Sequence, residues 1–161
     1  MRTILVAPAG HRVGLTSACF GLVRALDQRG VRVAFVKPIG AAHPGPDRAC
    51  ALVRLGSSLN PPEPIPRAQV ADLLSRGDDQ VLLEQVVALA AKAAAQADVL
   101  IVEGMVPEST LVYATRVNAL MLKALDAELV LVGTPRDQTP EQVAAAIAIA
   151  ARGLGALGER T

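Results

Sequence analysis

A segment near the amino end has the layout of a phosphate-binding loop but lacks the lysine of that loop. In the motif G-x-x-x-x-G-K-[ST], glycines let backbone amides approach phosphate oxygens, the lysine contacts the terminal phosphates, and the hydroxyl group binds Mg²⁺. Gly14 and Thr16 occupy the second-glycine and hydroxyl positions. Ala9 stands in place of the first glycine, and Leu15 stands in place of the lysine. We therefore expect a degenerate loop that keeps an anion-binding backbone.

The missing lysine argues against ordinary ATP hydrolysis. A charge-assisted hydrogen bond contributes ~1.5–3 kcal/mol, and removing one stabiliser of transition-state charge lowers a rate on the order of 10²–10³-fold. An anion can still bind at the amino end of the following helix, where free amides and the helix dipole favour negative charge by roughly 0.3–1 kcal/mol. The alternative is a glycine-rich turn that binds no ligand. The loop residues that we expect to contact a nucleotide are Gly10, Val13, Gly14, Leu15, Thr16 and Ser17.

Lys37 is a second candidate for anion binding. It follows an apolar strand expected at 31–36 and precedes Pro38, which favours extended backbone at the residue before it. The ammonium should therefore emerge at the carboxyl end of the sheet, where it can contact a phosphate or a carboxylate. A solvated lysine at a strand end explains the same pattern, so both interpretations stay open.

Glu103 is the third candidate, at the end of the apolar run 99–102. An acidic residue in this place positions Mg²⁺ or its water in many nucleotide hydrolases. If a Mg-nucleotide binds, Thr16 and Glu103 are the expected metal ligands. Burial at the end of an apolar strand disfavours a carboxylate without a partner. The structural alternative is that Glu103 accepts hydrogen bonds from Thr16, Ser17 or backbone amides.

The remaining composition excludes several classes of protein. The net charge is +1 with 2% aromatic residues, and no run of five like charges occurs, so we expect no nucleic-acid binding. No apolar run reaches the ~18 residues that span a bilayer, and we expect no membrane partner. His11 and His43 lack neighbours at zinc-ligand spacing. Cys19 and Cys50 also lack it; Cys19 should be a buried free thiol, and a cytoplasmic location is expected.

Apolar periodicity predicts an α/β fold in a single domain, residues 1–161. Hydrophobic residues make up 52% of the chain, and small aliphatic side chains are typical of helices packed on a buried parallel sheet. Strands are expected at 3–7, 31–36, 97–102 and 128–132. Helices are expected at 15–29, about 47–55, 67–75, 79–96, about 110–125 and 139–152. Right-handed crossovers then bring the Gly10–Thr16 loop, Lys37 and Glu103 to the same edge of the sheet.

These motifs together resemble the N-terminal domain of the long bacterial phosphate acetyltransferases. That domain is similar to dethiobiotin synthetase and the cobyrinic acid amidases, which share its P-loop-type fold. The loop of dethiobiotin synthetase reads V-G-K-T, so Leu15 departs from the ATP-using pattern, and leucine here favours the phosphate acetyltransferase branch. The resemblance rests on Ala7-Pro8-Ala9-Gly10, Val13-Gly14-Leu15-Thr16-Ser17, Val31-Arg32-Val33, Phe35-Val36-Lys37-Pro38-Ile39, the run 100–107, the run 114–125 and the run 127–132.

The resemblance implies a regulatory and assembly role without a catalytic residue. The parent enzyme interconverts acetyl-CoA plus phosphate with acetyl phosphate plus CoA, and its transferase site lies in a separate C-terminal domain, the expected partner. Implied effectors are a nucleotide (ATP or NADH) or an organic acid such as pyruvate or phosphoenolpyruvate, and a homo-oligomer is expected. One alternative is an ATP-dependent carboxylase or amide ligase of the dethiobiotin synthetase type, with Arg12 or Lys37 replacing the missing lysine. The other is a structural scaffold that binds nothing.

The resemblance also predicts a strand order and an incomplete edge. Related ATPases order their strands two, three, one, four, and the family domain continues into a further strand of the type G-V-I-[VL]-N-K, which 155–161 does not contain. We therefore expect a fragment that lacks the last strand. An uncovered apolar edge invites pairing or aggregation. We expect a second chain, a symmetry mate or the C-terminal tail to cover it.

Overall fold

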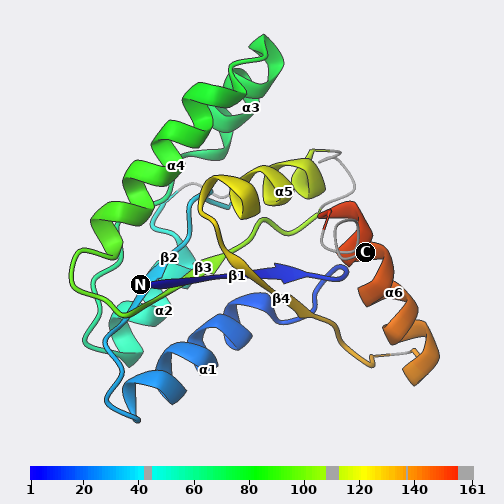
Figure 1. Ribbon diagram of the computed structural model, residues 1–161, viewed down its shortest axis with the longest axis horizontal. Helices are drawn as coiled ribbons and strands as arrows, with labels where there is room; N and C mark the ends of the chain where they lie inside the picture. The colour runs from blue at the N-terminus through cyan, green and yellow to red at the C-terminus, as the bar shows by residue number, and fades with distance from the viewer. Residues whose placement is uncertain (42–44, 108–112, 137, 156–161) are drawn as a thin grey trace.

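Four parallel strands form the centre of the molecule, with helices on both faces (Figure 1). The computed structural model describes residues 1–41, 45–107, 113–136 and 138–155. The sheet order is β2-β3-β1-β4, which confirms the α/β class, the parallel sheet and the expected strand order. The strands are β1 (Arg2–Pro8), β2 (Val33–Val36), β3 (Val99–Glu103) and β4 (Glu128–Val132). The helices are α1 (Leu15–Asp27), α2 (Arg48–Gly56), α3 (Arg67–Arg76), α4 (Asp79–Ala93), α5 (Ala114–Ala124) and α6 (Pro140–Gly153).

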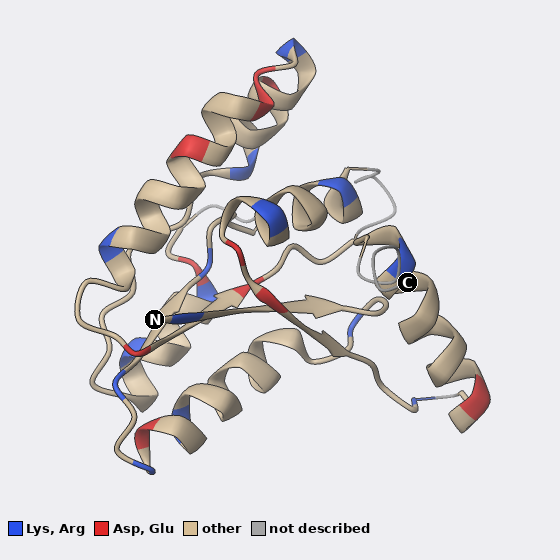
Figure 2. Cartoon of the chain, viewed as in Figure 1, with Lys and Arg blue, Asp and Glu red and all other residues tan. Residues whose placement is uncertain are grey.

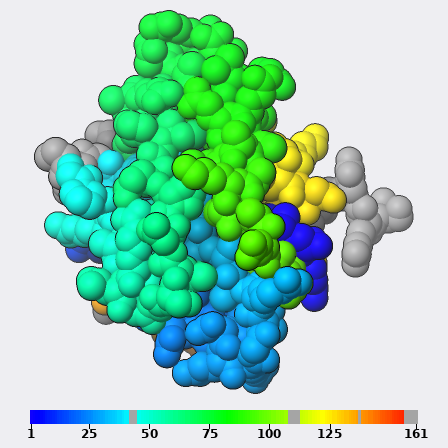
Figure 3. Space-filling view, turned by 90° about the vertical axis from the view of Figure 1, so that its left-hand side faces the viewer, coloured from blue at the N-terminus to red at the C-terminus, as the bar shows by residue number. Residues whose placement is uncertain are grey.

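Alternation of side chains along the strands divides the core into two clusters. Leu5 of β1 and Val36 of β2 face a cluster formed with α3, α4 and α5. Their neighbours Val6 and Phe35 face the opposite cluster, formed with α1 and α2. α3 and α4 lie side by side on the outside of the first of these clusters (Figure 3). The central strands are thus buried on both faces, which explains their continuous aliphatic sequences.

The expected elements all appear in the described residues, with shifts at their ends. Gly30 adopts a φ of 75° and the Val31 amide donates to the Leu26 carbonyl at 3.1 Å, so β2 begins only at Val33. α4 ends at Ala93 rather than residue 96, because the chain turns between α4 and β3. The helix expected at about 110–125 is observed as α5, and its first residues fall in 108–112, outside the described residues.

α6 begins with the capping box that the sequence predicts. The Gln142 amide donates to Thr139 Oγ1 at 3.4 Å, and the Thr139 amide donates to Gln142 Oε1 at 2.8 Å. Pro140 occupies the first turn, where its missing amide proton is not needed. These contacts fix the start of α6 even though no described residue of this helix is buried.

β4 lies at one edge of the sheet and pairs only with β1 among the described strands. Val130 of β4 remains 38% exposed, whereas Leu5, Val6 and Ala7 of the adjoining β1 are fully buried. α6 contacts β4 and α5 at this side of the molecule (Figure 1). The expectation that another segment or chain covers β4 stays a prediction, and the tail 156–161 lies outside the described residues.

Charged residues are distributed over most elements, with no single acidic or basic face in view (Figure 2). Two strands also carry an acidic residue, Glu103 at the end of β3 and Glu128 at the start of β4. No described helix is both long enough and apolar enough to cross a membrane.

Candidate functional site

Three of the expected polar residues meet at the carboxyl ends of β2 and β3. Lys37 Nζ lies 3.4 Å from Glu103 Oε1, and Thr16 Oγ1 donates a 2.9 Å hydrogen bond to the same oxygen. A fourth residue, Asp47, brings its Oδ2 to 3.1 Å from Lys37 Nζ. We call Thr16, Lys37, Asp47 and Glu103 the Lys37 centre. Both carboxylates are buried, and the Lys37 side chain is 14% exposed.

The Lys37 centre is assembled from the ends of four elements. Lys37 directly follows β2, and Glu103 is the last residue of β3. Because β2 and β3 are parallel neighbours, their carboxyl ends lie at the same edge of the sheet. Thr16 is in the first turn of α1, and Asp47 is the N-cap of α2. The parallel topology therefore brings residues that are far apart in the sequence together in one polar cluster.

Asp47 is held rigidly by backbone amides as well as by Lys37. Its Oδ1 accepts hydrogen bonds from the amides of Ala49 at 2.9 Å and Cys50 at 3.3 Å, which caps α2. Its Oδ2 also accepts from the Ala41 amide at 3.3 Å. Asp47 thus joins the loop after β2 to the start of α2 and to Lys37.

The segment after Glu103 is fixed by close backbone packing. The Gly104 amide donates to the Val6 carbonyl at 2.9 Å, and a Cβ at Gly104 would lie 3.0 Å from that carbonyl oxygen. The buried Asn118 of α5 pairs with both backbone groups of Met105, accepting at 2.7 Å and donating at 2.8 Å. Glycine at 104 and asparagine at 118 therefore set the path of the chain that leaves β3 beside Glu103.

Burial raises the pKa of each carboxylate of the centre, and the neighbouring Lys37 ammonium lowers it. The net pKa shift is upward for Glu103 and downward for Asp47. Burial raises the pKa of Glu103, and the nearby Lys37 and the Thr16 hydroxyl offset this only in part, so the net pKa lies above its usual value. Burial also raises the pKa of Asp47, but Lys37 and the amides of Cys50 and Ala49 outweigh it and leave the pKa lowered. Burial lowers the pKa of Lys37, yet Glu103 and Asp47 bring its net pKa above the usual value.

The oxygen atoms of the centre fit a divalent cation only in part. Thr16 Oγ1 and Glu103 are oxygen ligands of the kind that Mg²⁺ prefers, and Glu103 Oε2 is buried without a hydrogen-bond partner. The Lys37 ammonium, however, already lies between Asp47 and Glu103. Among the described residues, no group of three His, Cys, Asp or Glu side chains is arranged to hold a metal. A metal at Thr16 and Glu103 would therefore compete with Lys37.

The expected loop residues separate into distinct environments. Gly14 caps α1 in the left-handed region with a φ of 77°. Leu15, at the position of the missing lysine, is only 4% exposed and packs in the core with α1 and α2. Ser17 is exposed on α1, outside the Lys37 centre. Thr16 alone of these residues joins the Lys37 centre.

Gly10 and Val13 line a different feature, which we call the loop cavity. It has a volume of about 370 Å³ and lies between residues 9–13, residues 133–136 with Gln138, and α6. Arg12, which adopts an uncommon positive φ of 51°, lines it together with His11 and Arg136. Basic residues from two loops therefore line one cavity beside the phosphate-type loop.

The sequence alone does not assign Asp47, Arg136 or Asn118 to the site. It places Asp47 only near the start of a short helix, although an acidic residue at an N-cap after a Gly-Pro pair is a readable signal. Arg136 follows β4 at the ligand end of the sheet, a position that also favours a binding residue. Asn118 lies on α5, and nothing in the sequence around it indicates its contact with the backbone of Met105.

Both cysteines are buried free thiols, as expected for Cys19. Burial, with Glu103 adding to it, raises the pKa of Cys19 far above the usual range. Burial and the charge of Asp47 raise the pKa of Cys50 to about 12. The two thiols are therefore protonated at neutral pH and pack as core residues.

Comparison with known proteins agrees with this geometry. A family model described as an AAA domain matches residues 2–158. The chain is 45% identical to a phosphate acetyltransferase of Pseudomonas aeruginosa over 158 residues, which cover 96% of this chain and 22% of that protein. It is 41% identical to the Deinococcus radiodurans phosphate acetyltransferase over 155 residues, 95% of this chain and 22% of that protein. The Escherichia coli enzyme is 38% identical over 146 residues, 88% of this chain and 20% of that protein.

The chain thus spans about a fifth of the length of these relatives. The resemblance to phosphate acetyltransferases is confirmed, together with the P-loop-type fold. The chain belongs to the AAA domain family, in the form found in the N-terminal region of bacterial phosphate acetyltransferases.

Proposed function

We propose that this domain is the N-terminal regulatory part of a phosphate acetyltransferase and binds an anionic effector without hydrolysing ATP. The supporting observation is that neither Leu15 nor Lys37 can supply the charge of the missing motif lysine. Leu15 replaces the motif lysine and is buried in the core. Lys37, one of the two nearby cations that could replace it, is held between Asp47 and Glu103. The loop therefore keeps its backbone but has no lysine directed at a terminal phosphate.

The loop cavity is the proposed place for a nucleotide effector such as ATP or NADH. Arg12 and Arg136 line it from two separate loops, so phosphate oxygens there can accept charge-assisted hydrogen bonds. Its volume of about 370 Å³ lies within the range of small-molecule sites. Gly10 and Val13 form the wall next to α1, where amides at the helix start also favour an anion.

A thermal-shift screen with ATP, NADH, pyruvate, phosphoenolpyruvate and CoA tests the proposal. A specific effector at a hundredfold excess over its Kd stabilises the folded chain by roughly 2.7 kcal/mol. Arg136→Gln should weaken binding of a nucleotide effector about tenfold, whereas Arg29→Gln, an exposed arginine outside the loop cavity, should leave it unchanged. An absence of stabilisation by any of the five compounds would favour the structural scaffold instead.

A second candidate is an ATP-dependent carboxylase or amide ligase of the dethiobiotin synthetase type. It is favoured by the hydrogen bond between Thr16 and Glu103, the two expected Mg²⁺ ligands, and by the unpartnered Glu103 Oε2. Phosphate release from Mg-ATP by the wild-type chain that disappears in Glu103→Gln would establish this candidate and overturn the first. Nucleotide binding that appears only in Leu15→Lys would exclude it, because the natural loop would then lack the necessary cation.

We further propose that the partner is a C-terminal transferase domain and that the complete enzyme is a cytoplasmic homo-oligomer. The fraction of each relative that this chain covers supports the existence of a further domain. The half-exposed edge strand β4 supports an assembly surface. Light scattering of the complete enzyme and of this chain at the same molar concentration tests the assembly. Monomeric behaviour of the complete enzyme would exclude it.

A further inference from the structure

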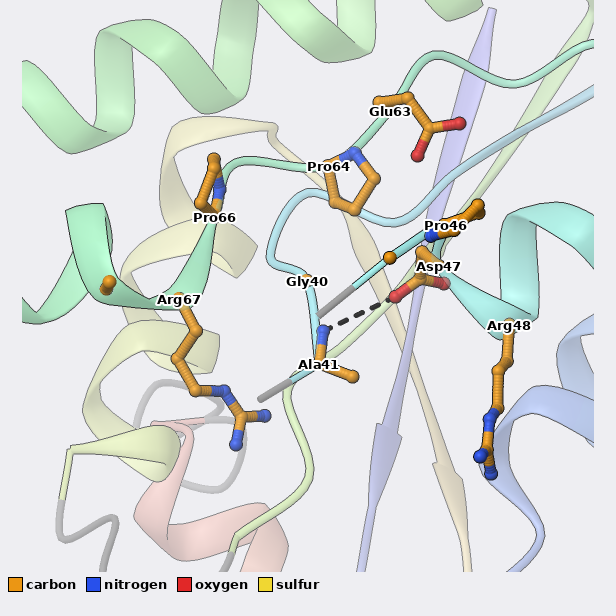
Figure 4. A pocket seen from close by; sticks show the side chains of 11 residues that line it. Gly40, Ala41, Pro46, Asp47, Arg48, Glu63, Pro64, Pro66 and Arg67 are labelled. Carbon is orange, nitrogen blue, oxygen red and sulfur yellow. Dashed lines mark hydrogen bonds between the residues drawn. The ribbon is translucent and has the colours of Figure 1, made fainter. Parts of the chain in front are cut away.

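A cavity beside Asp47 and a groove on the outer surface differ in their lining. The cavity has a volume of about 520 Å³, and four of its lining residues are charged (Figure 4). The groove has a volume of about 390 Å³ and lies between α4 and α5, and we call it the α4 groove. Five of its seven lining residues are apolar: Leu83, Val87, Ala88, Ala91 and Ala124. Such a lining suits an apolar protein surface better than a charged small molecule.

α4 is apolar on its outer side as well as on its inner side. The residues of α4 that are buried in the core are Leu82, Val86 and Ala90. On the outer side, Val81 and Val87 remain 43% and 41% exposed. Figure 3 shows α4 at the surface beside α3, with no described element over it. A surface helix normally has a polar outer face, so the apolar outer side of α4 is suited to a contact with another protein surface.

α4 carries only three charged residues, and two of them lie on the outer side. Asp79, in the first turn, pairs with Arg116 of α5. Within the described part of the chain, Glu84 accepts one side-chain hydrogen bond, from Gln80 of the same helix at 3.3 Å, and Lys92 forms no ion pair. Glu84 and Lys92 are exposed and lie eight residues apart. Each therefore lacks a partner of opposite charge among the described residues.

An antiparallel contact between α4 helices of two copies matches these charges. A two-fold axis at Ala88 places each residue opposite the residue that is equally far from Ala88 in the other copy. Glu84 and Lys92 are each four residues from Ala88, and at about 100° per residue they lie at equal angles on its two sides. Glu84 of each copy thus faces Lys92 of the other, whereas an axis at either charged residue would bring like charges together. The small Ala88 side chain allows the helices to approach to about 8 Å.

We propose that the outer side of α4, with the α4 groove, is an interface between two copies of this chain, antiparallel across a two-fold axis at Ala88. The second copy covers the exposed apolar residues, and the two symmetric Glu84–Lys92 pairs select the register. The proposal rests on the homo-oligomer proposed above and assigns it a surface. It requires neither effector binding in the loop cavity nor pairing of β4.

Sedimentation velocity of the 161-residue chain at increasing concentrations tests the register. The wild-type chain should shift from monomer to dimer. Lys92→Glu and Glu84→Lys each replace two attractive contacts with repulsive ones, so each should weaken the dimer about tenfold or more. The double variant restores opposite charges and should return the dimer Kd to within about threefold of wild type. Arg29→Glu changes the net charge as Lys92→Glu does but lies outside α4, and it should leave dimerisation unchanged.

Disulfide cross-linking tests the position of the axis. Two copies of Ala88→Cys should form an intermolecular disulfide under mild oxidation, because residues on the axis can meet the Cα separation of about 4.4–6.8 Å that a disulfide needs. Val81→Cys is the matched control on the same helix. It lies seven residues from Ala88, so its two copies would be about 21 Å apart and should not cross-link. Cys19 and Cys50 are buried and should not react.

Three results would overturn the proposal. One is a wild-type chain that stays monomeric at every concentration, and another is a double variant that dimerises as weakly as the single variants. The third is equal cross-linking of Ala88→Cys and Val81→Cys. The substituted side chains are exposed except at Val81, which is 43% exposed, so all variants should fold, and circular dichroism verifies this. A complete enzyme that is oligomeric while this chain stays monomeric would exclude the α4 interface and leave the proposed function intact.

Discussion

The two sides of the ligand edge are built very differently. On the β2–β3 side, Lys37 directly follows Phe35 and Val36 of β2, which are 2% and 0% exposed. On the β4–α6 side, Val130 is 38% exposed and Ile149 is 68% exposed. Stability is rarely uniform within a fold, and weakly packed segments open first. The polar centre therefore belongs to the well-packed side, whereas the outer wall of the loop cavity belongs to the weakly packed side.

The largest expected effect is a difference between two apolar truncations. Phe35→Ala should destabilise the fold by about 3–5 kcal/mol, because it removes a large side chain from the packed core. Ile149→Ala should change stability by no more than about 0.5 kcal/mol, because that side chain is mostly in solvent. Urea unfolding of both variants measures the difference. Similar losses in the two variants would show that α6 is covered in solution, and the comparison between the two sides would then fail.

Removal of the central ammonium should have the next largest effect. Lys37→Met leaves Asp47 and Glu103 buried without their shared cation, and breaking a buried ion pair in this way costs about 3 kcal/mol or more. The exposed Lys92→Met on α4 is the matched control and should be nearly neutral. Urea unfolding of both variants near neutral pH measures this. A neutral result for Lys37→Met would mean that the carboxylates do not depend on this cation, and the Lys37 centre would not contribute to rigidity.

The fold could be predicted because its signals are local. Alternating apolar runs and turn residues such as Gly30 and Pro140 mark strands and helices without knowledge of the tertiary structure. The predicted ends of these strands and helices are less accurate than their centres, because the ends depend on contacts that form only in the folded chain. β2, for example, starts late because Val31 still caps α1 through the Leu26 carbonyl.

The candidate site was predicted only in part, for a physical reason. The convergence of Thr16, Lys37 and Glu103 follows from parallel topology, because all three lie at carboxyl ends of strands or at the following helix start. Asp47 and Asn118 act through contacts to chain segments distant from their own elements. Glu103 also accepts a hydrogen bond from the Thr16 hydroxyl, which is the structural alternative that the sequence offers for this carboxylate. Whether the loop residues bind an effector stays a prediction.

The contribution of the Lys37 centre to stability should depend on pH. The pKa of Glu103 is raised above the usual 4.5 in the folded chain, so the folded state holds this proton more tightly than the unfolded state. Its stabilising contribution is present below 4.5 and is lost as the pH rises through the folded pKa. The pKa of Asp47 is lowered, so its contribution is present above 3.8 and is lost as the pH falls.

Glu103→Gln removes only the first of these two contributions. The wild-type chain should therefore lose stability relative to Glu103→Gln as the pH is raised from about 4.5 towards neutrality. Urea unfolding of both proteins across this range measures the change in their difference. Asp98→Asn is a control, because this exposed carboxyl pairs with Arg32 and its pKa is lowered instead. A constant difference between wild type and Glu103→Gln would show that Glu103 has no raised pKa.

The smallest expected effect concerns the start of α6 and tests the weakly packed side directly. Thr139→Ala removes the hydroxyl that accepts from the Gln142 amide, and loss of an N-cap of this type costs about 1 kcal/mol. Because α6 has no buried residue among those described, this loss should appear as local opening of the helix rather than as global unfolding. Amide hydrogen exchange in α6 should accelerate about fivefold, since ~1.4 kcal/mol corresponds to tenfold. Exchange in α1, which packs in the core through Leu15, Cys19 and Val23, should not change. Equal acceleration in both helices would mean that α6 opens only when the whole domain unfolds, and the loop cavity would then share the rigidity of the Lys37 centre.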